Sequence, residues 1–368
     1  MSLKEIFCQD KPIDILQRSF AVDRSAHAYI FAGLQGIGKF KTACEWARML
    51  LCKETVTENG FTDSCGLCES CQLIEGNSHP DFIHVYKELR EFTKNGKGKA
   101  APIDMPIDVI REFLIVQAPS KPKMSPRKVF VVSEAEKLNA ASQNALLKIL
   151  EEPPEYCTII LLCTRLEKLL ATTKSRCRII RFSPIDTDRI IDKLSQIGLE
   201  NTQAKYFARL AQGSIGQGCQ WAKLELAGAD LYQTKTDIIQ SLSKCRYADS
   251  VDMAQRLLDQ SKKIALNWAK IEQDTSKADI NRRALKTIVQ IVISTLHDAM
   301  KLSVTEDTEI INFDQKEQIE QLAKLFGAEL SAEKITHAYK AMRWIEANVN
   351  EKLIFEHLLL NFNISGNI

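Results

Sequence analysis

The chain has no long apolar run. No stretch of its 368 residues reaches about 18 uninterrupted apolar residues, the length that a membrane-spanning helix needs. The N-terminal segment, from Met1 to Asp14, also lacks the apolar run of a secretory signal peptide. We therefore expect no membrane span and a cytoplasmic location.

The chain also lacks a strong charge of either sign. Lys and Arg together number 49, Asp and Glu number 47, and the formal net charge is +2. Such a balance gives no overall attraction to nucleic acid, so any contact with DNA would have to come from a local positive patch.

A disulfide framework is missing as well. The 11 cysteines are an odd number, and Cys44, Cys157 and Cys163 each lie singly among apolar residues. That setting is typical of reduced, buried thiols, and disulfides are rare in cytosolic proteins. The cysteines between residues 52 and 71 are grouped instead.

From about residue 25 to 183, short β-branched or apolar runs alternate with helical patterns. Three of the runs are typical of buried strands: Tyr29 to Ala32, Val129 to Val132, and Thr158 to Leu162. Alternation of this kind predicts a parallel sheet with helices on both faces. A Lys- and Gly-rich segment, Lys94 to Lys99, is expected to be an exposed loop.

The pattern changes at Ser183 and Pro184. The residues from 184 to 226 predict a small helical unit. From 227 to 368, long amphipathic segments with few Gly or Pro predict an all-α domain; these segments are Ala284 to Leu296, Lys316 to Phe326, and Glu333 to Phe362. We thus predict domains at 1–183, 184–226 and 227–368.

A glycine-rich loop follows the first predicted strand. The segment from Gly33 to Phe40, GLQGIGKF, has the spacing of a Walker A phosphate loop except at its last residue. In such a loop the glycines let backbone N–H groups surround phosphate oxygens, and the lysine reaches the terminal phosphates. The candidate nucleotide-binding residues are therefore Gly33, Gly36, Gly38 and Lys39. The alternative is that the glycines only form a tight turn.

Two oxygen ligands of a Mg²⁺ site are missing. Phe40 stands where a Walker A loop places Ser or Thr, and an aromatic carbon cannot replace a hard oxygen ligand. Thr42 lies about 200° further round the helix and should not substitute for it. Ser133 stands where an ATPase of this kind places its metal-binding Asp, whereas Glu134 keeps the position of the catalytic base, although it could equally be a charge at a helix start. These losses leave binding of ATP or ADP open and disfavour Mg²⁺ and hydrolysis.

Four cysteines, Cys52, Cys65, Cys68 and Cys71, are grouped in one short segment. Cys-x-x-Cys steps on tight turns bring thiolates to one point, as tetrahedral Zn²⁺ requires. No His lies among them and no open coordination position is implied, so a structural zinc site at residues 52–71 is predicted. The alternative is a set of reduced, unpaired thiols.

Several motifs resemble one protein family. The segment Ser64 to Leu73, with Ser78 to Asp81, resembles the zinc module that follows the phosphate loop in the clamp-loader subunits of bacterial DNA polymerase III. Asn144 to Pro154 is similar to the segment after the Walker B strand of that family, and Ser175-Arg176-Cys177 matches its SRC motif. Ala347 to Leu353 resembles its C-terminal collar. The likeness covers nearly the whole chain.

The resemblance implies an AAA+ architecture, in which a P-loop NTPase-like α/β domain carries the zinc insertion and is followed by a helical lid and an all-α collar for assembly. It implies a role in DNA replication inside a hetero-oligomer with gamma/tau motor subunits and a delta subunit, which loads the sliding clamp onto primed DNA. The chain would thus be a subunit of a DNA-directed DNA polymerase, a nucleotidyltransferase. It also implies that Arg176 is an arginine finger for a neighbour's ATP site. Without the resemblance, Arg176 would be interpreted as a surface arginine.

Departures from the motor pattern favour the branch of this family that does not hydrolyse ATP. Phe40 and Ser133 spoil the metal site, and the segment Gly213-Ser214-Ile215-Gly216 places glycine where motor subunits carry a nucleotide-sensing arginine. Thr164 matches the first sensor position. We therefore predict a stator without ATPase activity of its own. The alternatives are an ATP-hydrolysing gamma/tau-type motor and a zinc-containing nucleic-acid binder acting alone, and the collar helices could also form a self-contained bundle.

Overall fold

The chain divides into two compact units, Met1–Ile185 and Asp186–Ile368. The computed structural model describes residues 2–22, 25–95, 104–244, 246–272, 275–305 and 308–363. The loop expected at Lys94 to Lys99 lies mostly outside these ranges. Among the helices within them, none combines the length and the apolar character that crossing a bilayer requires.

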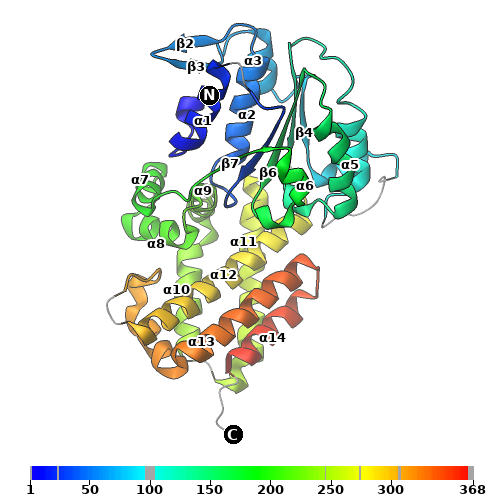
Figure 1. The fold of residues 1–368 in the computed structure, drawn as a ribbon. Coiled ribbons are helices and arrows are strands. Elements are labelled where there is room, and N and C mark those ends of the chain that lie inside the picture. The colour runs from blue at the N-terminus through cyan, green and yellow to red at the C-terminus, as the bar shows by residue number, and fades with distance from the viewer. Residues whose placement is uncertain are drawn as a thin grey trace. The chain divides into compact units, whose positions relative to one another are not determined.

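The first unit is built on a five-stranded parallel sheet (Figure 1). The strands lie in the order β4-β5-β6-β1-β7, and in chain order they are β1 (Ala28–Ala32), β4 (Phe82–Val85), β5 (Lys128–Val132), β6 (Cys157–Cys163) and β7 (Arg178–Arg181). Ile30 of β1 lies opposite Leu161 of β6 on one side and Ile179 of β7 on the other. The three predicted strands are confirmed as β1, β5 and β6, whereas the sequence analysis missed β4 and β7.

Helices cover both faces of this sheet, as predicted (Figure 1). One face packs against α1 (Asp10–Ala21), α2 (Lys39–Leu51) and α3 (Glu69–Glu75), and the other against α4 (Ile107–Ile110) with its continuation Arg111–Ile115 and α5 (Ala140–Glu151). Side chains of β1 alternate between the two cores, because Tyr29 and Phe31 face α2 while Ile30 faces α5. A short hairpin, β2 (Val56–Glu58) and β3 (Phe61–Asp63), precedes α3, and α6 (Ala171–Ser175) joins β6 to β7.

The second unit is helical throughout its described residues. Its helices are α7 (Thr187–Ile197), α8 (Asn201–Ala211), α9 (Ile215–Leu224), α10 (Leu231–Lys244), α11 (Ser250–Ile271), α12 (Lys277–Val304), α13 (Lys316–Glu346) and α14 (Glu351–Asn363). Gly327 breaks the helical geometry of α13, in agreement with the predicted end at Phe326. The prediction of one segment from Glu333 to Phe362 was wrong, because the chain turns between α13 and α14. Asn348 in this turn has a φ of 55°, in the left-handed region.

Buried polar contacts join the predicted lid residues to the rest of the helical unit. The side chain of Lys235 on α10 is fully buried, and its Nζ lies 2.5 Å from a carboxylate oxygen of Asp314. The same ammonium lies 4.8 Å from the ring centre of Tyr206 on α8. A buried charge is tolerated only when it is paired, so the Lys235 contacts tie α8 and α10 to the segment before α13. At the surface, Arg209 on α8 also pairs with the exposed Glu309 at 3.5 Å.

Candidate functional site

The phosphate loop lies between β1 and α2, at the carboxyl edge of the sheet, where open α/β folds form their binding sites. A Cβ at Gly33 would lie 2.7 Å from the carbonyl oxygen of Phe182, so no other residue fits there without a shift of the backbone. Gly36 and Gly38 have φ values of 76° and 100°, which favour glycine. Tight-turn geometry and the spacing of a phosphate loop are therefore present together.

We expect Gly33→Ala to lower the free energy of unfolding of the full chain by about 1–3 kcal/mol, because the new methyl group overpacks a rigid backbone contact. Urea denaturation measures the change. Gly76→Ala is the matched control, since Gly76 has a φ of −80°. The nearest atom to a Cβ there would be 3.5 Å away. An equal loss in both variants would contradict the importance of the Gly33 contact.

Lys39 is folded back onto its own loop. Its Nζ donates hydrogen bonds to the carbonyl oxygens of Gly33, at 2.7 Å, and Leu34, at 2.6 Å. Burial lowers the pKa of Lys39 to about 8, although the nearby carboxylate of Glu136 and the thiol of Cys163 act in the opposite direction. A phosphate would therefore have to displace the loop carbonyls from this ammonium group.

Aromatic rings and a hydrogen-bonded hydroxyl lie on the side of the loop where the Mg²⁺ ligands are missing. The ring of Phe40 packs against that of His84 with the centroids 4.6 Å apart and the planes tilted by 47°, and the ring centroids of His84 and Tyr86 are 4.8 Å apart. His84 Nε2 shares a hydrogen bond of 2.8 Å with Ser133 Oγ. Burial lowers the pKa of His84 to about 4, so the imidazole is neutral at pH 7. The sequence analysis missed His84 and Tyr86, because it did not recognise β4.

Glu134 is held by two cations. Its carboxylate lies 2.6 Å from the Nζ of Lys137 and 3.4 Å from that of Lys87. The residue has a φ of 52°, lies two residues beyond β5 and directly precedes the short 3-10 helix Ala135–Lys137. It therefore lies at a helix start, and its role as a base stays a prediction. A water molecule would therefore have to compete with two ammonium groups for this carboxylate.

Glu136 points toward the first-sensor position. Its carboxylate accepts hydrogen bonds from the backbone N–H of Thr164, at 3.1 Å, and from the hydroxyl of the same residue. With the loop residues, Glu134 and Glu136 line a cavity of about 420 Å³. The structure therefore brings together the loop, Ser133, Glu134 and Thr164, and it adds Glu136, which the sequence analysis did not single out.

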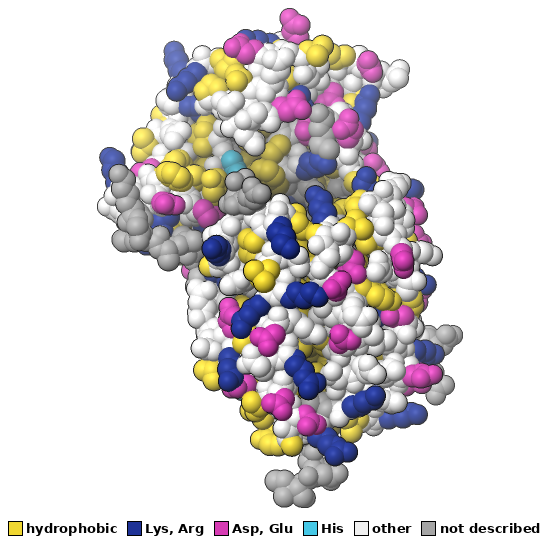
Figure 2. Space-filling view, turned by 180° about the vertical axis from the view of Figure 1, so that it is seen from behind, with side chains coloured by type: hydrophobic (Ala, Val, Ile, Leu, Met, Phe, Trp, Pro, Cys, Tyr) yellow, Lys and Arg dark blue, Asp and Glu magenta, His cyan; other side chains and the backbone are white. Residues whose placement is uncertain are grey.

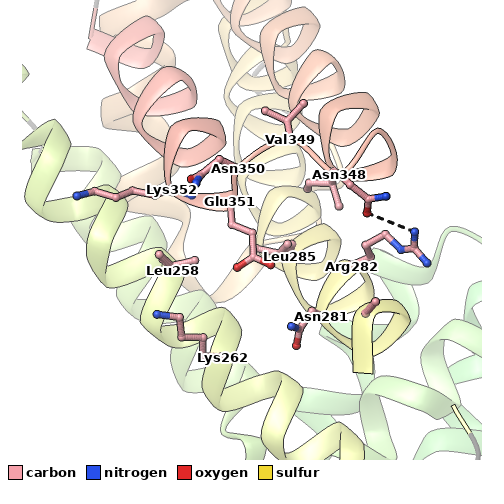
Figure 3. Close-up of a pocket in the computed structure, with 12 residues that line it drawn as sticks. Leu258, Lys262, Asn281, Arg282, Leu285, Asn348, Val349, Asn350, Glu351 and Lys352 are labelled. Atoms are coloured by element: carbon pink, nitrogen blue, oxygen red, sulfur yellow. Dashed lines mark hydrogen bonds between the residues drawn. The ribbon is translucent and has the colours of Figure 1, made fainter. Parts of the chain in front are cut away.

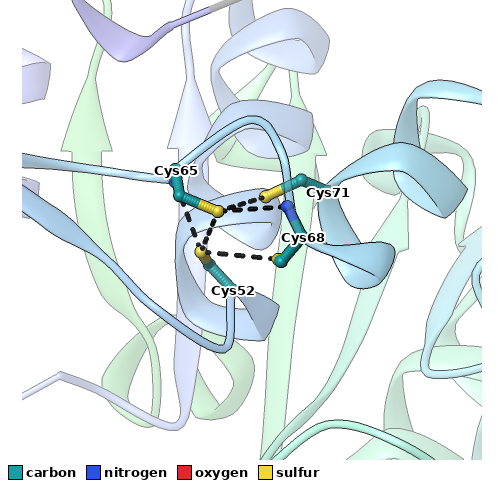
Figure 4. Close-up of side chains that lie close together, drawn as sticks. All are labelled: Cys52, Cys65, Cys68 and Cys71. Carbon is teal, nitrogen blue, oxygen red and sulfur yellow. Dashed lines mark hydrogen bonds between the residues drawn. The ribbon is translucent and has the colours of Figure 1, made fainter.

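The four grouped cysteines converge at the end of α2. Cys52 follows the last residue of that helix, and Cys71 lies in α3 (Figure 4). Their sulfur atoms all lie within 4.8 Å of one another. The Sγ of Cys52 is 3.6 Å from that of Cys65 and 3.9 Å from that of Cys68, and the Sγ atoms of Cys65 and Cys71 are 4.0 Å apart. The four residues could thus hold a metal ion.

The donor set fits tetrahedral zinc. Four sulfurs at the usual Zn–S distance of about 2.3 Å stand about 3.8 Å from one another, close to the spacings found here. Backbone N–H groups also donate to the sulfurs: Cys65 N lies 3.3 Å from Cys52 Sγ, and Cys68 N lies 3.3 Å from Cys65 Sγ. Such bonds stabilise thiolates, the form that binds metal.

A buried polar network connects the cysteine segment to the sheet. His79 Nε2 lies 3.1 Å from Ser125 Oγ, which also lies 3.1 Å from the hydroxyl of Ser70 on α3. The backbone N–H of Asp81 donates to His79 Nδ1, so Nε2 carries the proton of the neutral ring. The carboxylate of Asp81 accepts bonds from the backbone of residues 123–125. The Ser78 to Asp81 motif is therefore structural, anchoring the far end of the module.

Arg176 caps the end of α6 and remains accessible, since 34% of its side chain is exposed. One guanidinium nitrogen lies 2.7 Å from a carboxylate oxygen of Glu151 on α5. Another donates to the carbonyl oxygen of Thr172, at 3.0 Å, and to the hydroxyl of Ser175, at 3.3 Å. The SRC motif and the segment Asn144 to Pro154, which are separate in sequence, therefore meet at this arginine.

The collar-like segment lines a cavity of about 520 Å³ between α11, α12 and the turn before α14 (Figure 3). Asn348 accepts a bond from Arg282 at 3.5 Å, and Asn350 caps α14 through the backbone N–H of Lys352 at 3.0 Å. Glu351 points between Leu258 and Leu285 in Figure 3. Gly216 lies in the first turn of α9 and, being glycine, offers no side chain to a nucleotide.

A parallel sheet in the order β4-β5-β6-β1-β7, a Walker-type loop after the interior strand β1 and a helical C-terminal region define a P-loop ATPase fold of the AAA+ class. A family model described as DNA polymerase III, delta subunit, matches residues 8–186. A second, described as DNA polymerase III, delta subunit, C terminal, matches residues 275–363. The chain belongs to this DNA polymerase III clamp-loader family.

Two relatives agree with this assignment in sequence, one named subunit delta' and one named subunit tau/gamma. DNA polymerase III subunit delta' of Bacillus subtilis is 24% identical over 353 residues, which cover 96% of this chain and 95% of that protein. DNA polymerase III subunit tau/gamma of Haemophilus influenzae is 30% identical over 259 residues, 69% of this chain and 35% of that protein. A solved gamma subunit-related protein of Thermotoga maritima matches with a TM-score of 0.45 and 16% identity over 96% of this chain and 98% of that one. This chain thus spans nearly all of the delta' relative but about a third of the tau/gamma relative.

Proposed function

We propose that this chain is a delta-prime-type subunit of the DNA polymerase III clamp loader, a stator that does not hydrolyse ATP. The proposal rests on the side chains that occupy the side of the phosphate loop where Mg²⁺ would bind. There the ring of Phe40 packs against that of His84, and the hydroxyl of Ser133 is hydrogen-bonded to the same imidazole. Neither group offers Mg²⁺ the oxygen ligands that phosphoryl transfer needs.

The rest of the pocket agrees with a loss of hydrolysis. Lys39 is satisfied by carbonyl oxygens of its own loop, and Glu134 is paired with Lys87 and Lys137. A water-activating base must contact the attacking water, and the Glu134 carboxylate would have to leave its two lysines to do so. ATP or ADP could still enter the cavity, without the metal that makes its terminal phosphate reactive.

In this proposal, the chain contributes to catalysis through Arg176. The guanidinium would project into the ATP site of a neighbouring gamma/tau motor, where its permanent charge and forked donors stabilise the charge of the transferred phosphoryl group. The accessible position of Arg176 at the end of α6 supports this role. In the assembly, the phosphate would replace Glu151 as the partner of the arginine.

The remaining assignments follow from the same proposal. The structural metal at Cys52, Cys65, Cys68 and Cys71 is Zn²⁺, residues 184–226 form a lid, and residues 227–368 form the collar that holds the subunits together. The partners are the gamma/tau motor and the delta subunit, with the sliding clamp and primed DNA reached through the assembly. The complex works in the cytoplasm, at the replication machinery of the nucleoid.

The isolated chain is expected to hydrolyse no ATP above background, with or without primed DNA, because its pocket cannot hold Mg²⁺ in place. Steady-state release of phosphate measures this, and Lys39→Ala should change nothing. DNA-stimulated turnover that Lys39→Ala abolishes would instead identify an ATP-hydrolysing motor.

The same preparation tests whether the chain binds nucleic acid by itself. On the face drawn in Figure 2, Lys and Arg side chains alternate with Asp and Glu over the helical unit, so that face presents no continuous basic surface. Weak DNA binding is therefore expected. Tight, strongly salt-dependent binding by the isolated chain would favour a nucleic-acid binder acting alone.

A further inference from the structure

A buried arginine lies between the phosphate-loop helix and the cysteine cluster. Arg48 belongs to the last turn of α2, and only 4% of it is exposed. Its guanidinium lies 3.7 Å from the carboxylate of Glu45, one turn earlier on α2, and 3.4 Å from that of Glu75 on α3. Arginine is seldom buried to this extent without partners, so we expect negatively charged groups around its guanidinium.

The same guanidinium faces the cysteines. Cys52 follows Arg48 by one helical turn, and Cys71 precedes Glu75 by one turn on α3. A Cβ at Gly66, in the Cys65-x-x-Cys68 step, would lie 3.8 Å from Arg48 Nη2. A side-chain hydrogen bond links Arg48 to Cys71, and a guanidinium group is always charged in proteins. Arg48 therefore keeps its positive charge beside the thiols.

We propose that Arg48 is the positioning residue that compensates the negative charge of the metal-bound thiolates and ties the metal centre to α2. Zn²⁺ with four thiolates carries a net charge of −2, and a charge enclosed by protein is costly unless a counter-charge lies close to it. Arg48 donates to one ligand, Cys71, and is fixed by carboxylates on both helices. The proposal rests on the zinc site of the proposed function.

The alternative is that Arg48 only joins α2 to α3 through Glu75. The carboxylate of Glu75 is accessible, with 68% of its side chain exposed, and its pair with Arg48 is long. If that pair were the purpose of Arg48, Glu75→Gln would weaken the module as much as Arg48→Met does. Under charge compensation, Glu75→Gln leaves zinc affinity unchanged or higher, because it removes a competing anion.

The test is the zinc affinity of the full chain, measured by competition with a chromophoric chelator. Partners that orient and polarise metal ligands typically contribute a factor of about 10–100 in affinity, so Arg48→Met should bind zinc about 10–100-fold more weakly. Arg48→Lys keeps the charge and should recover most of that loss. Lys53→Met is the matched control, because Lys53 lies next to Cys52 but pairs with the exposed Glu69 at 3.1 Å. The zinc affinity of Lys53→Met should equal that of the parent chain.

A second pair of variants separates a loss of zinc affinity from a loss of folding. Arg48→Met leaves Glu45 buried without its cation, so Glu45→Gln/Arg48→Met is measured beside Glu45→Gln alone, with circular dichroism to check the fold. The double variant should bind zinc about 10–100-fold more weakly than Glu45→Gln does. When Co²⁺ replaces zinc, the thiolate-to-metal absorption of the double variant should differ from that of Glu45→Gln. Equal zinc affinity in these two variants overturns the role of Arg48. A parent chain that binds no zinc at all would instead refute the metal site itself.

Discussion

Replacing Arg176 with Ala is expected to lower the ATP turnover of the reconstituted clamp loader by a factor of about 10³ to 10⁵, because arginines supplied in trans contribute that much to phosphoryl transfer. The variant chain should remain folded and assembled. The ion pair of Arg176 with Glu151 is exposed to solvent, and such pairs contribute about 0–1 kcal/mol to stability. The weakness of that pair also leaves the guanidinium free to turn toward a neighbour's phosphate.

The measurement uses the motor and delta subunits, the sliding clamp and primed DNA, with size-exclusion chromatography to verify assembly. Arg178→Ala is the matched control, since Arg178 is an exposed arginine only two residues further along the chain. Its turnover should equal that of the parent complex. Arg176→Lys should remain slow, because an ammonium group keeps the charge but not the forked donors. Unchanged turnover by an intact Arg176→Ala complex would remove this arginine from the mechanism.

The sequence predicted the centre of the sheet better than its edges. Strands β1, β5 and β6 are buried along their whole length, so each appears as a continuous apolar run. The edge strand β7 carries Arg178 and Arg181 at its two ends, and only Ile180 between them is fully buried. Such a strand has neither a continuous apolar run nor enough length for a clear alternation, so it became visible only through its pairing with β1.

The candidate sites show the same limit of local information. The cysteine spacing and the loop glycines are local in sequence, and both were found there. The groups that replace a Mg²⁺ site are not local: His84 reaches Ser133 only because β4 pairs with β5 in the register that places His84 opposite Val131. Arg48 likewise approaches the cysteines because α2 packs beside α3. The spacing of the sequence motifs shows which Mg²⁺ ligands are missing, whereas the fold shows which side chains lie in their positions.

Removing zinc is the other change with a large expected effect. Cys68→Ser, or a strong chelator, should release the metal and greatly accelerate hydrogen exchange in residues 52–75. Structural zinc contributes about 10–16 kcal/mol of binding free energy in small zinc-finger peptides, where metal binding and folding are coupled. Here the opening should stay local, because Asp81 and His79 anchor the next segment to residues 123–125 without the metal. Exchange in β4 should therefore change little.

The extent of that opening distinguishes a structural metal from an incidental one. Helices α11 to α14 belong to a separate compact unit, so they should keep the exchange rates of the parent chain after zinc is lost. Cys8→Ser is the matched control, since Cys8 is exposed and lies outside the cluster, and it should retain one zinc per chain. Metal analysis that finds no zinc in the purified parent would refute the site. Unchanged exchange after verified zinc loss would show that the fold of residues 52–75 rests on the protein's own contacts, with the metal bound only afterwards.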